Sequence, residues 1–359
     1  MAARNAKSDK GGTAEEALHE YFLLTGAFVL RGVPVRSGLE DVTDVDLWVY
    51  SRTNSFARHI SIVDIKNKRR GKAFERAVWV KGLQSLLGAD QAIIATQGAK
   101  PEVYDFASTL DVRVISGTLF KSLIKKYSTT NTRLTAEIID QEWKSTRISR
   151  ANLKAIMDEE KSHISAGMSF AALNSWLDKA GELLKLSVER ERKPGPITRA
   201  AYLTCALVAI GADFISREQA LSEASVRKDF FRNGLLFGNA DSSSGKSYTN
   251  FTETMVTEYA DPTGALAAQI RSGFEKAVSN MPLQGLVEFF SRANSSAELY
   301  KGAIRLEAEC YASEITHPSK LNSIEAKTII GLISDYAGIP RRDILGEKAS
   351  EIHDNGKLL

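Results

Sequence analysis

Two stretches decide the fold of the first third of the chain: TDVDLWVY (Thr43–Tyr50) and SIVDIKNKRR (Ser61–Arg70). The first alternates polar and apolar residues with a period of two, which is the pattern of a half-buried strand. The second begins with an apolar run, and a strand that is apolar on both faces is normally central in its sheet. Side chains alternate along a strand, so Asp64 and Lys66 share one side, and Asp46 joins them if the two strands are neighbours.

The surrounding sequence predicts a mixed α/β fold. Periodicity and turn residues indicate strands over 27–35, 43–50, 59–66, 91–95 and 112–115, with helices over 13–25, 71–87 and 101–110. That order is typical of a mixed sheet flanked by helices. The Ser/Thr-rich stretch YSTTNTR (Tyr127–Arg133) predicts a boundary between a domain of residues 1–127 and a mostly α-helical domain of residues 134–359.

The acidic residues on the two strands suit a metal. Asp46, Asp64 and the backbone carbonyl of Ile65 would form an oxygen-rich pocket for Mg²⁺, with Mn²⁺ expected to substitute. Such an ion polarises a phosphodiester and lowers the pKa of a bound water. Lys66 can orient that water or neutralise the developing charge. These are the functions that hydrolysis of DNA needs at neutral pH.

Together the two stretches resemble the PD-(D/E)XK nuclease superfamily, the restriction endonuclease-like fold of many restriction enzymes, Holliday-junction resolvases and Mrr-like nucleases. Asp46 stands at the family's first acid, and Asp64 and Lys66 stand at its (D/E)-x-K. The family also places a Glu in its first helix; Glu15 has the matching spacing to the glycine that ends the helix, and Glu16 is the second choice. The resemblance covers roughly residues 13–120.

This resemblance implies a metal-dependent endonuclease acting on DNA, with Glu15 as a further catalytic and metal-binding residue. It departs from the family in one place, since Val45 stands where the motif has proline. Family members commonly serve in defence against foreign DNA, and we expect that role by analogy of fold. DNA is the expected partner, although the motif does not distinguish it from RNA. One site per chain favours a homodimer for cutting both strands of a duplex.

A basic cluster follows the second strand and is expected to bind nucleic acid. Lys68, Arg69, Arg70 and Lys72 lie just beyond Lys66, where they would neutralise backbone phosphates without reading sequence. Residues 1–127 carry 19 Lys and Arg against 14 Asp and Glu, whereas the remainder carries 28 against 30. The first part is therefore the one whose charge suits a nucleic acid. The cluster could instead be an ordinary solvated turn.

The sequence leaves several alternatives open. Asp44 and Asp46 could be solvated residues, and Asp64 and Lys66 could form a surface ion pair. Glu15 could have no role beyond a favourable interaction with the helix dipole. The protein would then be a non-cleaving module that binds nucleic acid or a partner. In a third interpretation, the nuclease is a subunit that stays silent until a regulatory protein binds the helical domain.

Other features bound the class of protein. The two cysteines give no disulfide framework, so a reducing cytoplasm is expected. The longest uncharged run, between Arg199 and Asp213, falls short of the roughly 20 residues that span a bilayer, and it predicts a buried helix. GNADSSSGKS (Gly238–Ser247) lacks the glycine spacing of a phosphate-binding loop and is expected to be a flexible polar loop.

Overall fold

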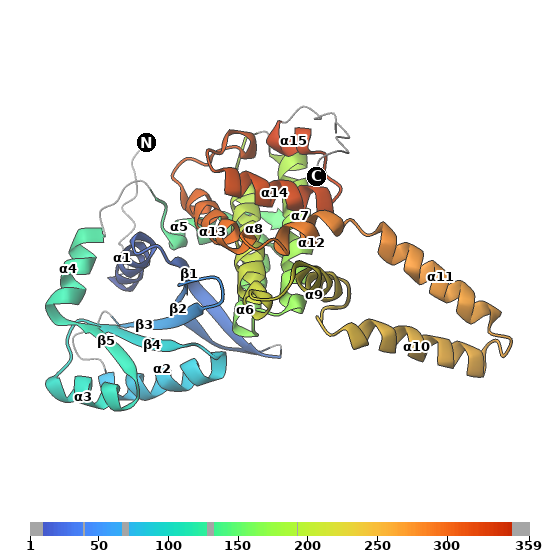
Figure 1. Ribbon diagram of the computed structural model, residues 1–359. Coiled ribbons are helices and arrows are strands. Elements are labelled where there is room, and N and C mark those ends of the chain that lie inside the picture. The colour runs from blue at the N-terminus through green and yellow to red at the C-terminus, as the bar shows by residue number, and fades with distance from the viewer. Residues whose placement is uncertain (1–9, 39, 67–71, 128–132, 192, 347–359) are drawn as a thin grey trace.

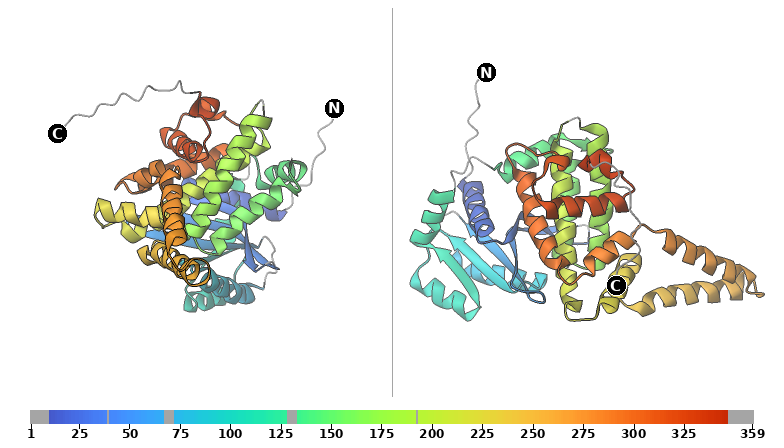
Figure 2. Two further views of the ribbon diagram at one scale, coloured as in Figure 1. Left: turned by 90° about the vertical axis from the view of Figure 1, so that its right-hand side faces the viewer. Right: turned by 45° about the horizontal axis from the view of Figure 1, so that its top comes forward.

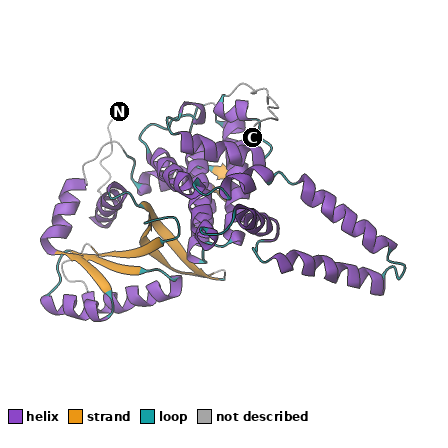
Figure 3. Ribbon diagram, viewed as in Figure 1, coloured by secondary structure: helices purple, strands orange, loops and turns teal. Residues whose placement is uncertain are grey.

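A five-stranded mixed sheet forms one side of the molecule, and a helical part packs against it (Figures 1 and 3). The computed structural model describes residues 10–38, 40–66, 72–127, 133–191 and 193–346. The sheet has the order β1-β2-β3-β4-β5. The first three strands pair antiparallel, and β3, β4 and β5 pair parallel. The strands are β1 (Phe28–Ser37), β2 (Glu40–Arg52), β3 (Arg58–Lys66), β4 (Gln91–Thr96) and β5 (Val112–Ser116).

Helices cover both faces of this sheet. On one face, α1 (Lys10–Leu24) and α4 (Gly117–Tyr127) bury Leu18 and Phe120 against Val29, Leu47 and Val63. On the other face lie α2 (Ala73–Leu87) and α3 (Pro101–Thr109), whose apolar residues join the core of Ile62 and Ile94. The α/β architecture with a mixed sheet is thus confirmed, and the predicted helices and strands of this part begin and end within three residues of the observed ones.

The rest of the described chain is almost entirely helical, as predicted. Its long central helix α8 is buried against α7 and α13, because nearly every side chain on it is apolar or small. By length and composition α8 could cross a membrane, but it lies inside the helical part. The elements are α5 (Ala136–Ser145), β6 (Arg147–Ile148), β7 (Ala151–Asn152), α6 (Leu153–Ser165), α7 (Phe170–Arg190), α8 (Pro196–Ser216), η1 (Arg217–Gln219), α9 (Ala224–Phe237), α10 (Ser242–Tyr259), α11 (Ala265–Asn280), α12 (Gln284–Phe290), α13 (Ser295–Tyr311), η2 (Pro318–Lys320), α14 (Ile324–Tyr336) and α15 (Arg341–Leu345).

The helical part closes the open edge of the sheet. Strand β1 lies at that edge, and α6 runs along it. Lys161 Nζ donates to the Arg31 carbonyl at 3.0 Å, and Ser165 Oγ donates to the Pro34 carbonyl at 2.8 Å. An edge whose carbonyls are already bonded is a poor template for pairing with another strand. Apolar residues of sheet and helices form one continuous core across this junction.

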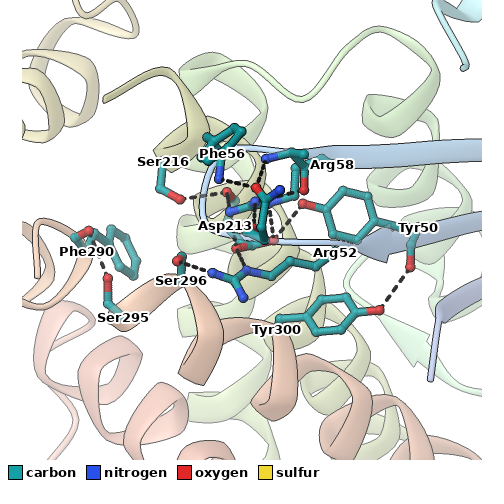
Figure 4. Close-up of polar contacts among 12 residues, drawn as sticks. Tyr50, Arg52, Phe56, Arg58, Asp213, Ser216, Phe290, Ser295, Ser296 and Tyr300 are labelled. Atoms are coloured by element: carbon teal, nitrogen blue, oxygen red, sulfur yellow. Dashed lines mark hydrogen bonds and ion pairs between the residues drawn. The ribbon is translucent and has the colours of Figure 1, made fainter. Parts of the chain in front are cut away.

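A buried polar cluster fixes the turn between β2 and β3 to α8 (Figure 4). Asp213 of α8 accepts a hydrogen bond from Tyr50 Oη at 2.6 Å. Arg58 donates to both oxygens of the same carboxylate, from Nε and Nη2, each at 2.8 Å. Arg52 Nε stands 3.4 Å from it and reaches Ser296 Oγ through Nη2 at 3.0 Å. The two strands that carry Asp46 and Asp64 are therefore anchored at their turn end.

The prediction of a polar loop over Gly238–Ser247 is wrong in its second half, because α10 begins at Ser242. A serine-rich start does not break a helix whose apolar positions, Phe251 and Met255, come two turns later. Residues 128–132 of the predicted domain boundary lie outside the described residues, so the division into 1–127 and 134–359 stays a prediction.

Candidate metal site where the pairing of β2 with β3 ends

Asp46 and Asp64 stand opposite each other where the pairing of β2 with β3 ends. The register runs from Arg52 and Arg58 to Leu47 and Val63, and the two acids occupy the next position. By alternation, Asp46 shares a face with Trp48, and Asp64 shares a face with Ile62. Trp48 and Ile62 both lie in the core beneath α2. Both carboxylates therefore project from the α2 face of the sheet.

Asp46 is half-buried and only partly hydrogen-bonded. Its Oδ2 accepts a hydrogen bond from the Ile65 backbone N–H at 2.6 Å. Within the described residues this is its one hydrogen bond, so Oδ1 keeps its lone pairs. Burial raises the pKa of Asp46, and the nearby charge of Glu15 adds to the rise, while the Ile65 N–H and the charges of Lys66 and Arg76 oppose it. The site thus disfavours a bare negative charge and would gain from a bound cation.

Asp64 is 8% exposed and is held by Arg76, in the first turns of α2. Arg76 Nε donates to Oδ2 at 2.8 Å, and Nη2 forms an ion pair with Oδ1. Burial lowers the pKa of Arg76, and the charge of Asp46 opposes this. A guanidinium stays protonated under such shifts. The cation that compensates Asp64 is therefore a side chain of the protein itself.

Lys66 completes the predicted trio. It ends β3, is half-buried and lies in register with Thr96 of the neighbouring strand. Its charge lowers the pKa of Asp46, which places the ammonium within electrostatic range of that carboxylate. The structure thus brings Asp46, Asp64 and Lys66 to one end of the sheet. Sequence reasoning missed Arg76, because one arginine on an amphipathic helix carries no signal that it points back at the preceding strand.

Glu15 takes a different position from the one that the resemblance implied. Its Oε2 accepts from Arg31 Nη2 at 2.8 Å, and the same guanidinium also binds Glu16 and Glu137. Arg31 lies opposite Leu47 and so faces α1, on the far side of the sheet from Asp64. Glu15 still raises the pKa of Asp46. It therefore lies close enough to contribute charge, although its described hydrogen bond goes to Arg31.

Glu16, the second choice for the helix carboxylate, belongs to a structural network. Burial opposes its ionisation, but a hydrogen bond with His19 and the charges of Arg31 and Arg133 lower the pKa of Glu16 to about 2. His19 and Arg133 also contact the buried Glu307 of α13. A carboxylate that interacts with two arginines and a histidine is already compensated, so Glu15 is the better candidate of the two.

Of the predicted phosphate-binding cluster, only Lys72 can be placed. Lys68, Arg69 and Arg70 lie outside the described residues. The Lys72 side chain is 78% exposed just before α2, with Nζ 2.9 Å from Glu75. Surface ion pairs of this kind contribute up to about 1 kcal/mol. The pair is therefore weak enough for Lys72 to exchange Glu75 for a phosphate.

The donor set suits a lightly held divalent ion. Across the described ranges, no three His, Cys, Asp or Glu side chains gather in a way that could hold a metal. Zinc sites usually need three or four such ligands. Mg²⁺ usually keeps several waters and takes one or two carboxylates together with substrate phosphates. Asp46 could offer its Oδ1 to such an ion, whereas Asp64 could offer an oxygen only if Arg76 released it.

Comparison with known proteins gave no relatives: no family model matches the chain, and searches of curated proteins and of solved structures found no match.

Proposed function

We propose that the protein is an Mg²⁺-dependent endonuclease with a restriction endonuclease-like core that hydrolyses phosphodiester bonds in DNA. The observation that carries the proposal is the position of Asp46 and Asp64 opposite each other where the pairing of β2 with β3 ends, with Lys66 two residues beyond Asp64. Arg76 compensates Asp64, whereas Asp46 has one backbone hydrogen bond and would gain from a bound cation. A structural role alone would not require the lysine or the unsaturated oxygen of Asp46.

Each residue has a distinct task in this proposal. Asp46 and Asp64 would hold the metal, with the Ile65 carbonyl as a further oxygen and Glu15 adding negative charge nearby. The bound ion would polarise the phosphodiester and lower the pKa of a water. Lys66 would orient the attacking water and neutralise charge that develops on the phosphate. Lys72 and the basic residues before it would hold the backbone without reading sequence.

Arg76 has to change partner for the metal to bind. Its guanidinium occupies both oxygens of Asp64, and its side chain is 27% exposed. Arginine matches phosphate with the same two-pronged geometry that it uses for a carboxylate. We therefore expect Arg76 to move from Asp64 to a substrate phosphate as the metal and the DNA arrive.

The test is cleavage of supercoiled plasmid by the purified protein with Mg²⁺ or Mn²⁺. Asp64→Ala and Lys66→Ala should each reduce cutting by at least about 100-fold, the usual effect of removing a group that acts on the transition state. Asp44→Asn removes an exposed acid from the same strand and should leave cutting within about twofold. If Asp64→Ala cut the plasmid as fast as the wild type, the assignment of the site would be disproved. A parallel assay with RNA shows whether DNA or RNA is the substrate.

The Arg76–Asp64 ion pair also favours a second candidate, a nuclease subunit that is silent until a partner binds. An arginine that closes the metal site could be withdrawn by a protein that docks on the helical part and shifts α2. This version is supported if wild type binds Mn²⁺ weakly and does not cut, while Arg76→Gln binds it well. A role in defence against foreign DNA suits either version and rests on the resemblance of the core motif alone.

A further inference from the structure

Helix α6 lies where the sheet meets the helical part and contacts both (Figures 1 and 2). It packs along strand β1 and against α7 and α8. Lys161 Nζ donates to the Arg31 carbonyl of β1 at 3.0 Å, and Trp176 Nε1 of α7 donates to the Glu160 carbonyl at 2.9 Å. A change in the packing of α6 therefore acts on both parts of the molecule.

Helix α6 buries three consecutive polar residues, one of which lacks a partner. Glu160 and Lys161 are each 3% exposed, and Ser162 is 7% exposed. Lys161 donates to a carbonyl of β1, and Ser162 Oγ donates to the Glu159 carbonyl at 2.7 Å. Glu160 differs from both, since its Oε2 is buried and has no hydrogen-bond partner among the described residues. A buried carboxylate without a donor destabilises the fold when it is ionised.

The charges that act on Glu160 do not neutralise it, because each is already paired elsewhere. Lys179 of α7 favours the ionised form, but its Nζ lies 2.6 Å from the carboxylate of Glu182. Glu159 disfavours the ionised form, as Glu182 does, and pairs with Arg36 of β1. Burial, with these two carboxylates adding to it and Lys179 opposing it, raises the pKa of Glu160 to about 7. The side chain therefore changes its charge near neutral pH.

His163 lies one turn further along α6 and does not supply the missing positive charge. Its Nε2 lies 3.2 Å from Ser175 Oγ of α7. Burial lowers the pKa of His163, while the charge of Glu159 opposes this fall and that of Arg36 adds to it. The imidazole is therefore mostly neutral at the pH where Glu160 ionises. Glu160 gains its negative charge while the neighbouring groups on α6 and α7 keep theirs.

We infer that Glu160 is a pH-sensitive contact between α6 and α7, which is well packed when the carboxyl is protonated and loosens when it ionises. Helix α6 also donates hydrogen bonds to the Arg31 and Pro34 carbonyls at the edge of the sheet. Loosening α6 therefore weakens the attachment of the helical part to β1, so that pH controls how firmly the two parts are joined. This inference is independent of the nuclease proposal, because it rests on the surroundings of Glu160.

The test is urea unfolding of the full chain at several pH values. The folded-state pKa of Glu160, about 7, lies above its ordinary value of 4.5, so its stabilising contribution is complete below pH 4.5 and is lost as the pH rises through 7. Between about pH 6 and about pH 8, the folding equilibrium constant of wild type should fall roughly tenfold relative to that of Glu160→Gln, which keeps the shape and stays neutral. Glu189→Gln, at an exposed position on α7, should show the same fall as wild type.

Hydrogen exchange shows where the fold loosens. After correction for the pH dependence of the exchange chemistry, the amides of α6 in wild type should be roughly tenfold less protected at about pH 8 than at about pH 6. In Glu160→Gln they should be equally protected at both, and the amides of α2 should not change in either protein. An equal pH dependence of wild type and Glu160→Gln in either measurement would overturn the inference. So would a loss of protection that is the same in α2 as in α6.

Discussion

Acidic residues lie at both ends of the pairing between β2 and β3, and their surroundings differ. At the turn end, Asp213 receives hydrogen bonds from Tyr50 and from two nitrogens of Arg58, so both of its oxygens are occupied. At the other end, Arg76 occupies both oxygens of Asp64, but Asp46 accepts one hydrogen bond, from the Ile65 N–H. Burial raises the pKa of Asp213 and of Asp46 alike. The difference lies in how completely hydrogen bonds and ion pairs compensate the negative charge.

That difference separates a structural acid from a functional one. A buried carboxylate surrounded by donors stabilises the fold and has nothing left to offer a ligand. One that keeps a free oxygen beside a second acid costs stability, which proteins accept where a site needs it. Asp213 is therefore the anchor of the two strands, and Asp46 with Asp64 is the proposed centre that the anchor holds in place.

The largest expected effect is on stability at the turn end. Asp213→Ala leaves the fully buried Arg58 side chain without its carboxylate and should lower the free energy of unfolding by about 3–5 kcal/mol. Asp46→Ala should change it by no more than about 1 kcal/mol, because burial already works against its charge. Urea unfolding followed by circular dichroism measures both. Equal losses in the two variants would erase the distinction between the ends.

A smaller effect is expected from Arg76, which competes with the metal for Asp64. A hydrogen bond to a charged group contributes about 1.5–3 kcal/mol, so Arg76→Gln should tighten Mn²⁺ binding by roughly tenfold or more. Arg113→Gln, at an exposed position on β5, is the matched control and should leave the affinity unchanged. Isothermal titration with Mn²⁺ gives the comparison. Weaker binding in Arg76→Gln would show that the arginine supports the metal site instead of blocking it.

The smallest expected effect is a shift in pH dependence. Since the folded-state pKa of Asp46 lies above its ordinary value of 3.8, metal binding is complete well above that pKa and is lost as the pH falls through it. The charge of Lys66 lowers this pKa. Lys66→Met should therefore raise it and move the loss of Mn²⁺ binding to higher pH, while Lys81→Met should not. If the pH profile of Lys66→Met were unshifted, the charge of Lys66 would have no effect on the pKa of Asp46.

The sequence predicts the surroundings of Asp46 and Asp64 better than those of Asp213. Alternation along two strands is a local signal, so the shared face of Asp46, Asp64 and Lys66 could be predicted from the residues alone. The partners of those acids could not, because they arrive from distant segments: Arg76 from the next helix, and Arg31 from an edge strand that draws Glu15 to the other face. Asp213 lies 155 residues from Arg58, and no local pattern links them.

Binding of Mn²⁺ to Asp46→Asn, measured beside Asp44→Asn, tests the central claim most directly, because it needs neither substrate nor a partner protein. Asn retains the shape of Asp46 and removes its charge, while Asp44→Asn removes an exposed charge two residues away. We expect wild type and Asp44→Asn to bind one Mn²⁺ per chain with similar affinity and Asp46→Asn to lose at least about tenfold. No binding by wild type, or equal binding by Asp46→Asn, would contradict a metal centre at this end of the sheet.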